Sequence, residues 1–332
     1  MQTTAKQHRK QKLALKRKLR RNEASRYPLE RSPLHQIRSI HTLAKLVGLS
    51  VEDFRAAARE PTFNTFDTVP DEGKSPRHVQ EPTQLSLTLH YHFTRLLDRI
   101  QRPDFLHSAT KRRSHVTNAQ AHSARAPMFC TDISKFYENT TQAHVKSFLL
   151  DLGWAPDLAR MMSFALCANG HLPTGSAVSP ILSYFAHRHA FDEIATLCQS
   201  AGVTMTLYVD DVTISGAHAT KTLLYRIKAI LTRCGLKTHK ERWSQSGTMV
   251  VTGAVPSPGG LRLRNKHRLS LMNLIERFRR GDFSIERKIA GKIASASNVD
   301  LGGVAVFRAR FAAARSEVER SISLSSAGKV KD

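Results

Sequence analysis

The chain has 332 residues, a formal net charge of +24 at neutral pH and an isoelectric point near 10.4. Its hydrophobic fraction of 41% is ordinary for a globular protein, and the excess of cations favours a polyanionic partner, because Lys and Arg contacts to phosphate release counterions. We find no apolar run that could span a bilayer and no signal-peptide pattern, which argues against a membrane protein. The four cysteines are widely spaced, which argues against a zinc site and a disulfide framework and fits a cytoplasmic protein.

Residues 1–31 form a strongly basic segment, with eleven Lys or Arg against Glu23 and Glu30. In isolation such a segment is disordered or loosely helical. We interpret it as an RNA-binding arm that folds on its partner; the alternative is a solvated tail. Residues 33–58 then predict small helices, with Ser50 capping the second.

Residues 62–81 predict a β-hairpin, because two apolar stretches flank the turn residues 71–73. Lys74 and Arg77 lie beside that turn, where solvated charges are common. Apolar residues at helical spacing then predict a packed helix over 85–100. His90 and His92 on this helix are interpreted as structural, since no acid or Cys stands at metal-ligand spacing.

Two apolar stretches carry acids. Residues 128–133 contain Asp132, and residues 205–215 predict two short strands that meet at a turn with Asp210 and Asp211 at its tip. Adjacent carboxylates repel one another unless a cation lies beside them, and Asp oxygens suit Mg²⁺. Three carboxylates at one sheet edge would hold two metal ions for in-line phosphoryl transfer. The alternative is that all three acids are ordinary turn and strand-end residues.

Between these stretches, residues 172–183 form a loop that enters a helix predicted from Ile181 towards Leu197. Gly175 permits close approach of the backbone to a ligand, and Thr174 precedes it. The alternative is an ordinary helix start.

The order of these three elements resembles that of the reverse transcriptases. That family has an Asp followed five residues later by an aromatic, then Leu-Pro-x-Gly-x-x-x-Ser-Pro, then Tyr-x-Asp-Asp. The resemblance implies that Asp132, Asp210 and Asp211 are catalytic and hold two Mg²⁺ ions, and that Tyr137 excludes the ribose 2′-hydroxyl. It places Gly175 and its neighbours against the template and the incoming nucleotide. It also implies that Lys74 or Arg77, in the fingers hairpin, meets the nucleotide triphosphate; the alternative is that both are solvated charges. The family more often has Gln where this chain has Thr174.

Two shorter motifs resemble the retron branch of that family: Asn118-Ala119-Gln120-Ala121-His122, and Val251-Thr252-Gly253. Taken singly, these could be a helix start with a surface His and a strand ending in a turn. The resemblance covers roughly residues 60 to 320, which is nearly the whole chain. From it we expect Asn118, His122 and the 251–253 triplet to contact RNA.

Towards the C-terminus, apolar residues predict a helix over 223–231, and the loop that follows carries Lys240 and Arg242. The resemblance puts a basic residue of this loop near the nucleotide triphosphate; Lys240 could protonate the pyrophosphate, whereas Arg242 would only neutralise it.

Residues 261–292 hold ten Lys or Arg against three acids and predict a helix with one apolar and one basic face. RNA-backbone contacts are expected from four arginines of this helix: Arg268, Arg277, Arg279 and Arg280. A last helix is predicted over 304–320.

The resemblance implies an α+β right-hand polymerase with an antiparallel palm sheet covered by helices. The expected domains are an arm with small helices over 1–58, fingers over 59–127, a palm over 128–253 and a helical thumb with a tail over 254–332.

The implied activity is RNA-directed DNA synthesis from dNTPs on a structured non-coding RNA, giving branched RNA-linked DNA in an anti-phage system that includes an effector protein. Two alternatives stay open: a reverse transcriptase related to group II introns, and a non-enzymatic RNA-binding scaffold.

Overall fold

The computed structural model describes residues 26–69, 75–122 and 124–327 and shows a mixed α+β fold. The basic residues 1–25, predicted to form an arm, lie outside the described residues. The N-terminal helices and the first hairpin are η1 (Leu29–Arg31), α2 (Ile40–Leu46), α3 (Val51–Arg59), β1 (Phe63–Asp67), β2 (His78–Pro82), α4 (Gln84–Asp98) and α5 (His115–Gln120). As predicted, Ser50 caps α3: its hydroxyl accepts a hydrogen bond from the backbone N–H of Asp53.

The central part of the chain holds a four-stranded antiparallel sheet in the order β4-β5-β3-β6. Its strands and helices are β3 (Met128–Ile133), α6 (Phe136–Asn139), α7 (Gln142–Asp151), α8 (Pro156–Ala165), α9 (Ser179–Ala186), α10 (Arg188–Ser200), β4 (Thr204–Tyr208), β5 (Asp211–Ser215), α11 (Lys221–Arg233) and β6 (Thr238–Ser244). The hairpin predicted over 205–215 and the strand predicted over 128–133 are therefore confirmed. The single helix predicted from Ile181 to Leu197 is instead two, because the chain breaks at His187, which caps both helices.

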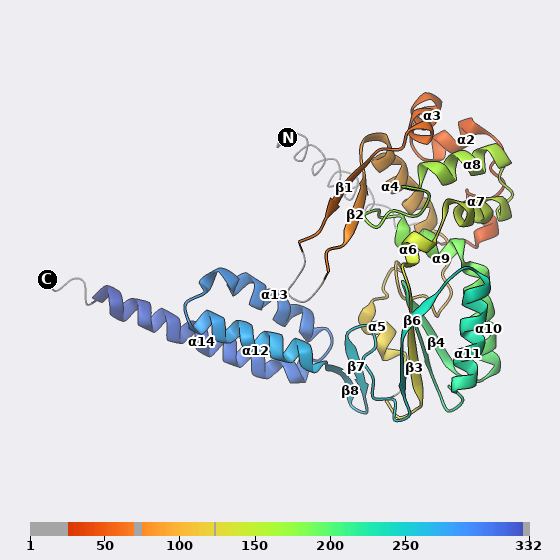
Figure 1. Cartoon of the computed structure of the whole chain (residues 1–332). Helices are drawn as coiled ribbons and strands as arrows, with labels where there is room; N and C mark the ends of the chain where they lie inside the picture. The colour runs from red at the N-terminus through yellow and green to blue at the C-terminus, as the bar shows by residue number, and fades with distance from the viewer. Residues whose placement is uncertain (1–25, 70–74, 123, 328–332) are drawn as a thin grey trace.

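The two faces of this sheet differ in chemistry because side chains alternate along each strand. One face carries apolar residues such as Phe129, Val212 and Ile214, which join the main hydrophobic core. The helices α10 and α11 pack along this side of the sheet (Figure 1). The other face carries small polar residues, among them Thr206 and Thr213, and α5 and the hairpin β7–β8 cover part of it.

After the sheet comes the hairpin of β7 (Ala254–Ser257) and β8 (Gly260–Leu263), followed by α12 (Asn265–Arg279), η2 (Phe283–Ile285), α13 (Glu286–Ser297) and α14 (Leu301–Ala327). The helices α12, α13 and α14, here called the C-terminal bundle, share a separate hydrophobic core that includes Leu271, Ile289 and Phe307. The amphipathic helix predicted in 261–292 is thus confirmed as α12, and the last helix is longer than predicted.

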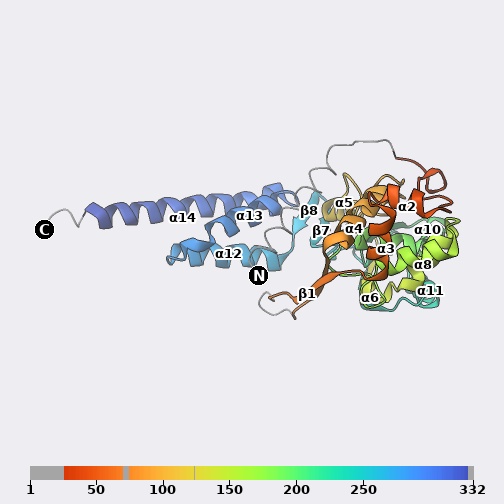
Figure 2. The ribbon, with the colours of Figure 1, turned by 90° about the horizontal axis from the view of Figure 1, so that it is seen from above.

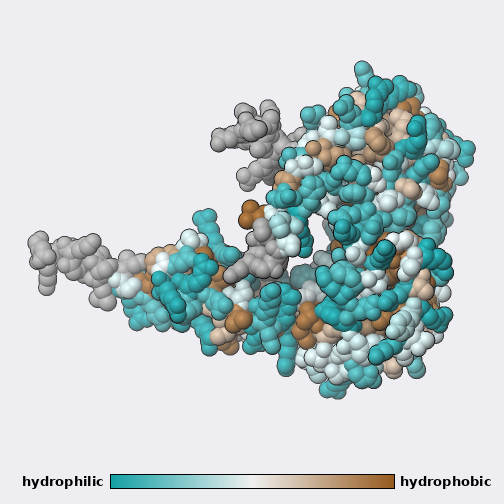
Figure 3. Space-filling model, viewed as in Figure 1, coloured by the Kyte–Doolittle hydropathy of each residue, from teal (hydrophilic) through white to brown (hydrophobic). Residues whose placement is uncertain are grey.

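The C-terminal bundle projects away from the rest of the molecule, and the hairpin β1–β2 reaches out on the same side (Figure 1). Seen from above, α14 forms the longest part of this projection (Figure 2). The surface is deeply hollowed between the bundle and the sheet, and hydrophilic residues cover most of the surrounding surface (Figure 3). Within the described part of the chain, none of the helices is both long and apolar enough to cross a membrane.

Candidate active site

The turn between β4 and β5 consists of Val209 and Asp210, since Tyr208 pairs with Asp211. Val209 has a φ of 59°, a left-handed conformation that is costly for a β-branched residue. The backbone N–H of Ile133 donates a hydrogen bond of 2.8 Å to the carbonyl oxygen of Asp210. This bond ties the turn to the end of β3 and fixes where the acidic side chains lie.

The register of the sheet brings the three predicted carboxylates together. Asp132 on β3 lies directly opposite Asp211 on β5, so both side chains share the polar face of the sheet. Burial, and then the negative charge of Asp132, raise the pKa of the Asp210 carboxyl. The same two causes raise the pKa of Asp211, and Arg242 and Lys240 oppose them. Like charges held this close favour binding of a cation.

Three basic groups already face these acids from β6. The Nζ of Lys240 lies 3.7 Å, and the Nε2 of His239 lies 3.5 Å, from the Oδ2 of Asp132. A bulge in the pairing of β3 with β6 and a φ of 53° at Lys240 let both residues reach this one carboxylate. Arg242, opposite Cys130, donates a 2.9 Å hydrogen bond to the carbonyl oxygen of Val250.

Lys240 and Arg242 are the two residues predicted to contact the nucleotide triphosphate. The Lys240 side chain is 71% exposed and can move, whereas Arg242 is held by its hydrogen bond to the Val250 carbonyl oxygen. His239 was not singled out in the sequence, because only the shifted register of β6 shows that it neighbours Asp132.

The oxygen-only donors of the three acids suit Mg²⁺, and their mutual repulsion would be relieved by it. As they stand, no three Asp, Glu, His or Cys side chains among the described residues converge closely enough to form a ready metal site. Lys240 and His239 occupy positions around Asp132 from which a metal ion would displace them, and Lys240 is exposed enough to leave.

Tyr137 lies beside these acids, five residues after Asp132. Lys135, with a φ of 48°, makes the sharp turn from β3 into α6 that brings the ring back towards the sheet. Burial, and next the charge of Asp210, raise the pKa of the Tyr137 hydroxyl. The aromatic ring therefore stays neutral and lies near Asp210, where the sugar of a bound nucleotide could contact it.

The loop 172–178 packs against the hairpin β1–β2. The N–H of Gly175 donates a 3.1 Å hydrogen bond to the carbonyl oxygen of Gln80, and the Thr174 hydroxyl donates a 2.7 Å hydrogen bond to the carbonyl oxygen of His78. A Cβ at position 175 would lie 2.7 Å from the Gln80 carbonyl oxygen, so only glycine fits. In this structure Gly175 approaches protein backbone, and Thr174 fastens the loop to β2.

The buried side chain of His90 packs against the loop 172–178. The Nδ1 of His90 lies 2.6 Å from the Ser176 hydroxyl, and its Nε2 lies 3.0 Å from the carbonyl oxygen of Ala165. Burial lowers the pKa of His90 to about 4, so the ring is neutral. The prediction that His90 is structural is confirmed.

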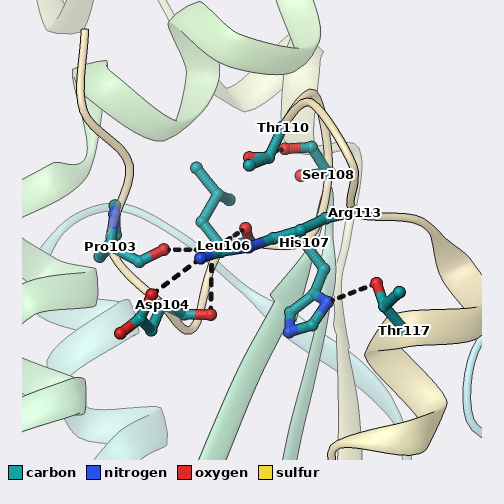
Figure 4. Close-up of polar contacts among 8 residues, drawn as sticks. All are labelled: Pro103, Asp104, Leu106, His107, Ser108, Thr110, Arg113 and Thr117. Carbon is teal, nitrogen blue, oxygen red and sulfur yellow. Dashed lines mark hydrogen bonds and ion pairs between the residues drawn. The ribbon is translucent and has the colours of Figure 1, made fainter. Parts of the chain in front are cut away.

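Ahead of α5, the segment 103–114 is docked along the edge of β4. The N–H of His107 donates to the carbonyl oxygen of Leu207, and the N–H of Leu207 donates to that of Phe105. The guanidinium of Arg113 donates to the carbonyl oxygens of three residues of the same segment, as Figure 4 shows: Pro103, Asp104 and Leu106. This clamp, which no sequence motif indicated, fixes the start of α5 beside the β4–β5 hairpin.

Asn118 and His122, predicted to contact RNA, are instead buried, with 0% and 5% of their surfaces exposed. The two ring nitrogens of His122 lie 2.7 Å from the Ser215 hydroxyl on β5 and 2.8 Å from the Thr206 hydroxyl on β4. Burial lowers the pKa of His122 to about 4. In this conformation neither side chain can reach RNA; His122 fastens α5 to the two strands that carry Asp210 and Asp211.

The motif at residues 118–122 and the triplet at residues 251–253 lie against each other. The Asn118 amide donates a 3.4 Å hydrogen bond to the Thr252 hydroxyl, which donates to the carbonyl oxygen of His115 at 2.7 Å. Val251 is fully buried, which excludes direct RNA contact by its side chain here. Thr252 and Gly253 are half-buried and line a cavity of about 340 Å³ whose other walls include Tyr208, Asp211, Arg242 and Arg264. This triplet therefore joins α5 to a cavity that is lined by Arg242 and Arg264 and also by Asp211.

The basic residues predicted on α12 are partly neutralised. Arg277 pairs with Asp282, Arg279 with Glu317, and Arg280 with Glu276, while the Arg268 guanidinium lies 5.9 Å from the centre of the Phe307 ring. Arg77 on the first hairpin is exposed, and Lys74 lies outside the described residues. The four arginines stay candidates for contact with a nucleic-acid backbone, and Lys74 and Arg77 stay candidates for contact with the nucleotide triphosphate.

Comparison with curated proteins gives three distant relatives of one kind. They are the retron Se72 reverse transcriptase of Salmonella heidelberg (21% identity over 54% of this chain), the retron Ec86 reverse transcriptase of Escherichia coli (25% over 66%) and the retron Mx65 reverse transcriptase of Myxococcus xanthus (27% over 50%). The matches cover 48%, 71% and 44% of these relatives, so the chain spans about half the length of two of them. No protein-family model matches the chain. Together with the motif order, these matches identify the chain as a distant homologue of the retron reverse transcriptases.

Proposed function

We propose that this protein is an RNA-directed DNA polymerase. The observation that carries the proposal is the sheet register, which sets Asp132 opposite Asp211 and brings the charge of Asp132 against Asp210. Tyr137 and the loop around Gly175 lie on the sides where a nucleotide sugar and a template base would be bound. The relatives, all named as reverse transcriptases, support the same activity.

On this proposal, the parts of the molecule have the roles of a right-hand polymerase. Residues 59–127, with the hairpin β1–β2, would act as fingers, and residues 128–253 as the palm. Residues 254–332, with the C-terminal bundle, would act as the thumb, and residues 1–58 would add the basic arm. The hydrophilic surface around the hollow beside the bundle would suit a nucleic-acid duplex (Figure 3).

In the reaction, a 3′-hydroxyl attacks the α-phosphate of a dNTP, a new O–P bond forms, and pyrophosphate leaves. Two Mg²⁺ ions held by Asp132, Asp210 and Asp211 would activate the hydroxyl and neutralise charge on the leaving oxygen. Lys240 can move towards the triphosphate and give a proton to the pyrophosphate. Arg242, fixed by the Val250 carbonyl, neutralises charge. Tyr137 orients the sugar and excludes a 2′-hydroxyl.

We further propose the retron activity itself: priming from an RNA 2′-hydroxyl and copying of a structured non-coding RNA into branched RNA-linked DNA. A defence role with an effector protein follows from the same family. The contact between the motif at residues 118–122 and the triplet at residues 251–253 supports this proposal. Thr252 and Gly253 of the triplet line the same cavity as Asp211. This cavity is where an initiating nucleotide of a folded RNA could be held.

A primer-extension assay with Mg²⁺, dNTPs and a primed RNA template tests the activity. Asp210→Asn and Asp211→Asn should each abolish extension while sparing most RNA affinity, because many cations rather than two acids dominate phosphate binding. Absence of extension by the wild-type chain would favour an RNA-binding scaffold. Near-normal extension by either variant would show that the catalytic acids are assigned wrongly.

A further inference from the structure

A second cavity lies away from the catalytic acids, between the first hairpin and the end of α8. We call it the hairpin cavity. Its volume is about 510 Å³, within the range of roughly 300–1,000 Å³ typical of ligand pockets. Its walls include Phe63 on β1, Gln80 on β2, Gln142 at the start of α7, Phe164 near the end of α8, and Asn169 in the following turn.

Two aromatic rings form part of the wall. Phe164 is 43% exposed and lines the cavity, so a ligand bound there could contact its ring. Phe63 is half-buried and packs edge-to-face against His90, with 5.8 Å between ring centres, which fixes its orientation. Rings presented in this way can stack on a planar ligand.

Three side-chain amides supply the polar part of the wall. Gln80 lines the cavity and is only 2% exposed. Gln142 makes one long hydrogen bond, 3.4 Å to the Ser163 hydroxyl. Asn169 and Gly170 form a tight two-residue turn, closed by paired backbone hydrogen bonds between Ala168 and His171, which fixes the backbone position of Asn169 in the cavity wall. Each amide offers both a donor and an acceptor.

Charge at the cavity favours a neutral ligand over a phosphate. Arg59 and Glu60 lie side by side at its rim, so their charges offset, and no other charged residue contributes to the described wall. Aromatic faces combined with amides are the means by which proteins bind unpaired bases of single-stranded nucleic acid.

The floor of the hairpin cavity is joined to the active site through Gln80. Its side chain lies in the cavity, while its carbonyl oxygen accepts the hydrogen bond from the N–H of Gly175. We propose that the hairpin cavity binds one unpaired base of the template strand ahead of the active site. This inference rests on the proposed polymerase function, because it takes the ligand to be the template.

The test is a series of primed RNA templates with a single-stranded 5′ overhang, each carrying one abasic ribose at a different overhang position. Affinity is measured by fluorescence anisotropy without dNTPs. For the wild-type chain, loss of the base should weaken binding about 5- to 150-fold at one overhang position, here called the sensitive position, since stacking on an aromatic side chain is worth about 1–3 kcal/mol per base. Phe164→Ala should bind the intact template as weakly as the wild-type chain binds that abasic one, and should show no preferred position.

Tyr225→Ala is the matched control, because Tyr225 is an aromatic residue 65% exposed on α11, outside the cavity wall. It should keep the wild-type pattern. Gln142→Leu keeps the ring in place and should reduce any preference for base identity at the sensitive position. A wild-type profile without a sensitive position, or equal weakening by Phe164→Ala at every position, would overturn the proposal. Primer extension on the intact template, run in parallel, reports on the polymerase function: loss of extension with a retained sensitive position would count against that function alone.

Discussion

Replacing His122 with Leu removes both hydrogen bonds that fasten the end of α5 to the β4–β5 hairpin. The hydroxyls of Ser215 and Thr206, 3% and 1% exposed, then lose their partner in the interior of the molecule. Each buried polar group left unpaired costs about 1–3 kcal/mol, so we expect the free energy of unfolding to fall by about 2–6 kcal/mol. The measurement is urea denaturation at pH 7.5, read as the shift in midpoint at unchanged slope.

His122 should also contribute to the pH dependence of the free energy of unfolding. The pKa of His122 is lowered by burial to about 4, whereas an unfolded His titrates near 6.5. Between these values the unfolded chain binds a proton that the folded chain does not, so stability falls as the pH is lowered from 6.5 to 4, by roughly 1.4 kcal/mol per pH unit. His122→Leu should lose this contribution, while His90 and His187, whose pKa values burial lowers to about 4 and about 3, retain theirs.

His218→Ala is the matched control, because His218 is exposed just beyond the end of β5. Its effect on the free energy of unfolding should stay within about 0.5 kcal/mol. The reasoning fails if His122→Leu weakens RNA binding while the urea midpoint stays at the wild-type value. That result would mean that α5 opens to expose this side chain to RNA.

Three further changes probe the site. Tyr137→Val should admit ribonucleotides, seen as incorporation of rNTPs by a folded, active variant; unchanged sugar discrimination would contradict the assigned role. Gly175→Ala should lower both stability and extension by displacing the first hairpin, whereas Gly291→Ala, in open space on α13, should be neutral or slightly stabilising in the same thermal melts. Changing Thr252 and Gly253 should reduce synthesis on the partner RNA but not on a generic primed template, and equal loss on both would indicate only a supporting role in the fold.

Much of the architecture could be predicted from local pattern. Alternating apolar residues around Asp132 and around the Asp210–Asp211 pair predicted the strands, and helical spacing predicted α4 and α12. Motif order predicted that these acids share a site, and the register of β3 with β5 puts two of them opposite each other.

What could not be predicted depends on contacts between segments far apart in the chain. The burial of Asn118 and His122 follows from how α5 packs on the sheet, which no property of residues 118–122 reveals. The approach of His239 to Asp132 depends on a bulge that shifts the register of β6. The close fit of Gly175 against β2 requires both partners to be folded, so the sequence indicated only that this glycine permits close approach, and predicted a ligand as the partner.

The left-handed conformation of Val209 has a consequence for how the molecule reaches its native state. A β-branched residue held at a φ of 59° disfavours the turn in the isolated hairpin by about 1–3 kcal/mol. The compensating contacts, such as the hydrogen bond from the Ile133 N–H to the Asp210 carbonyl oxygen, come from β3, some 77 positions earlier in the chain. We therefore expect the tip of the β4–β5 hairpin to order late in folding, after β3 has joined the sheet, so that a chain with an unassembled sheet also lacks a formed catalytic turn.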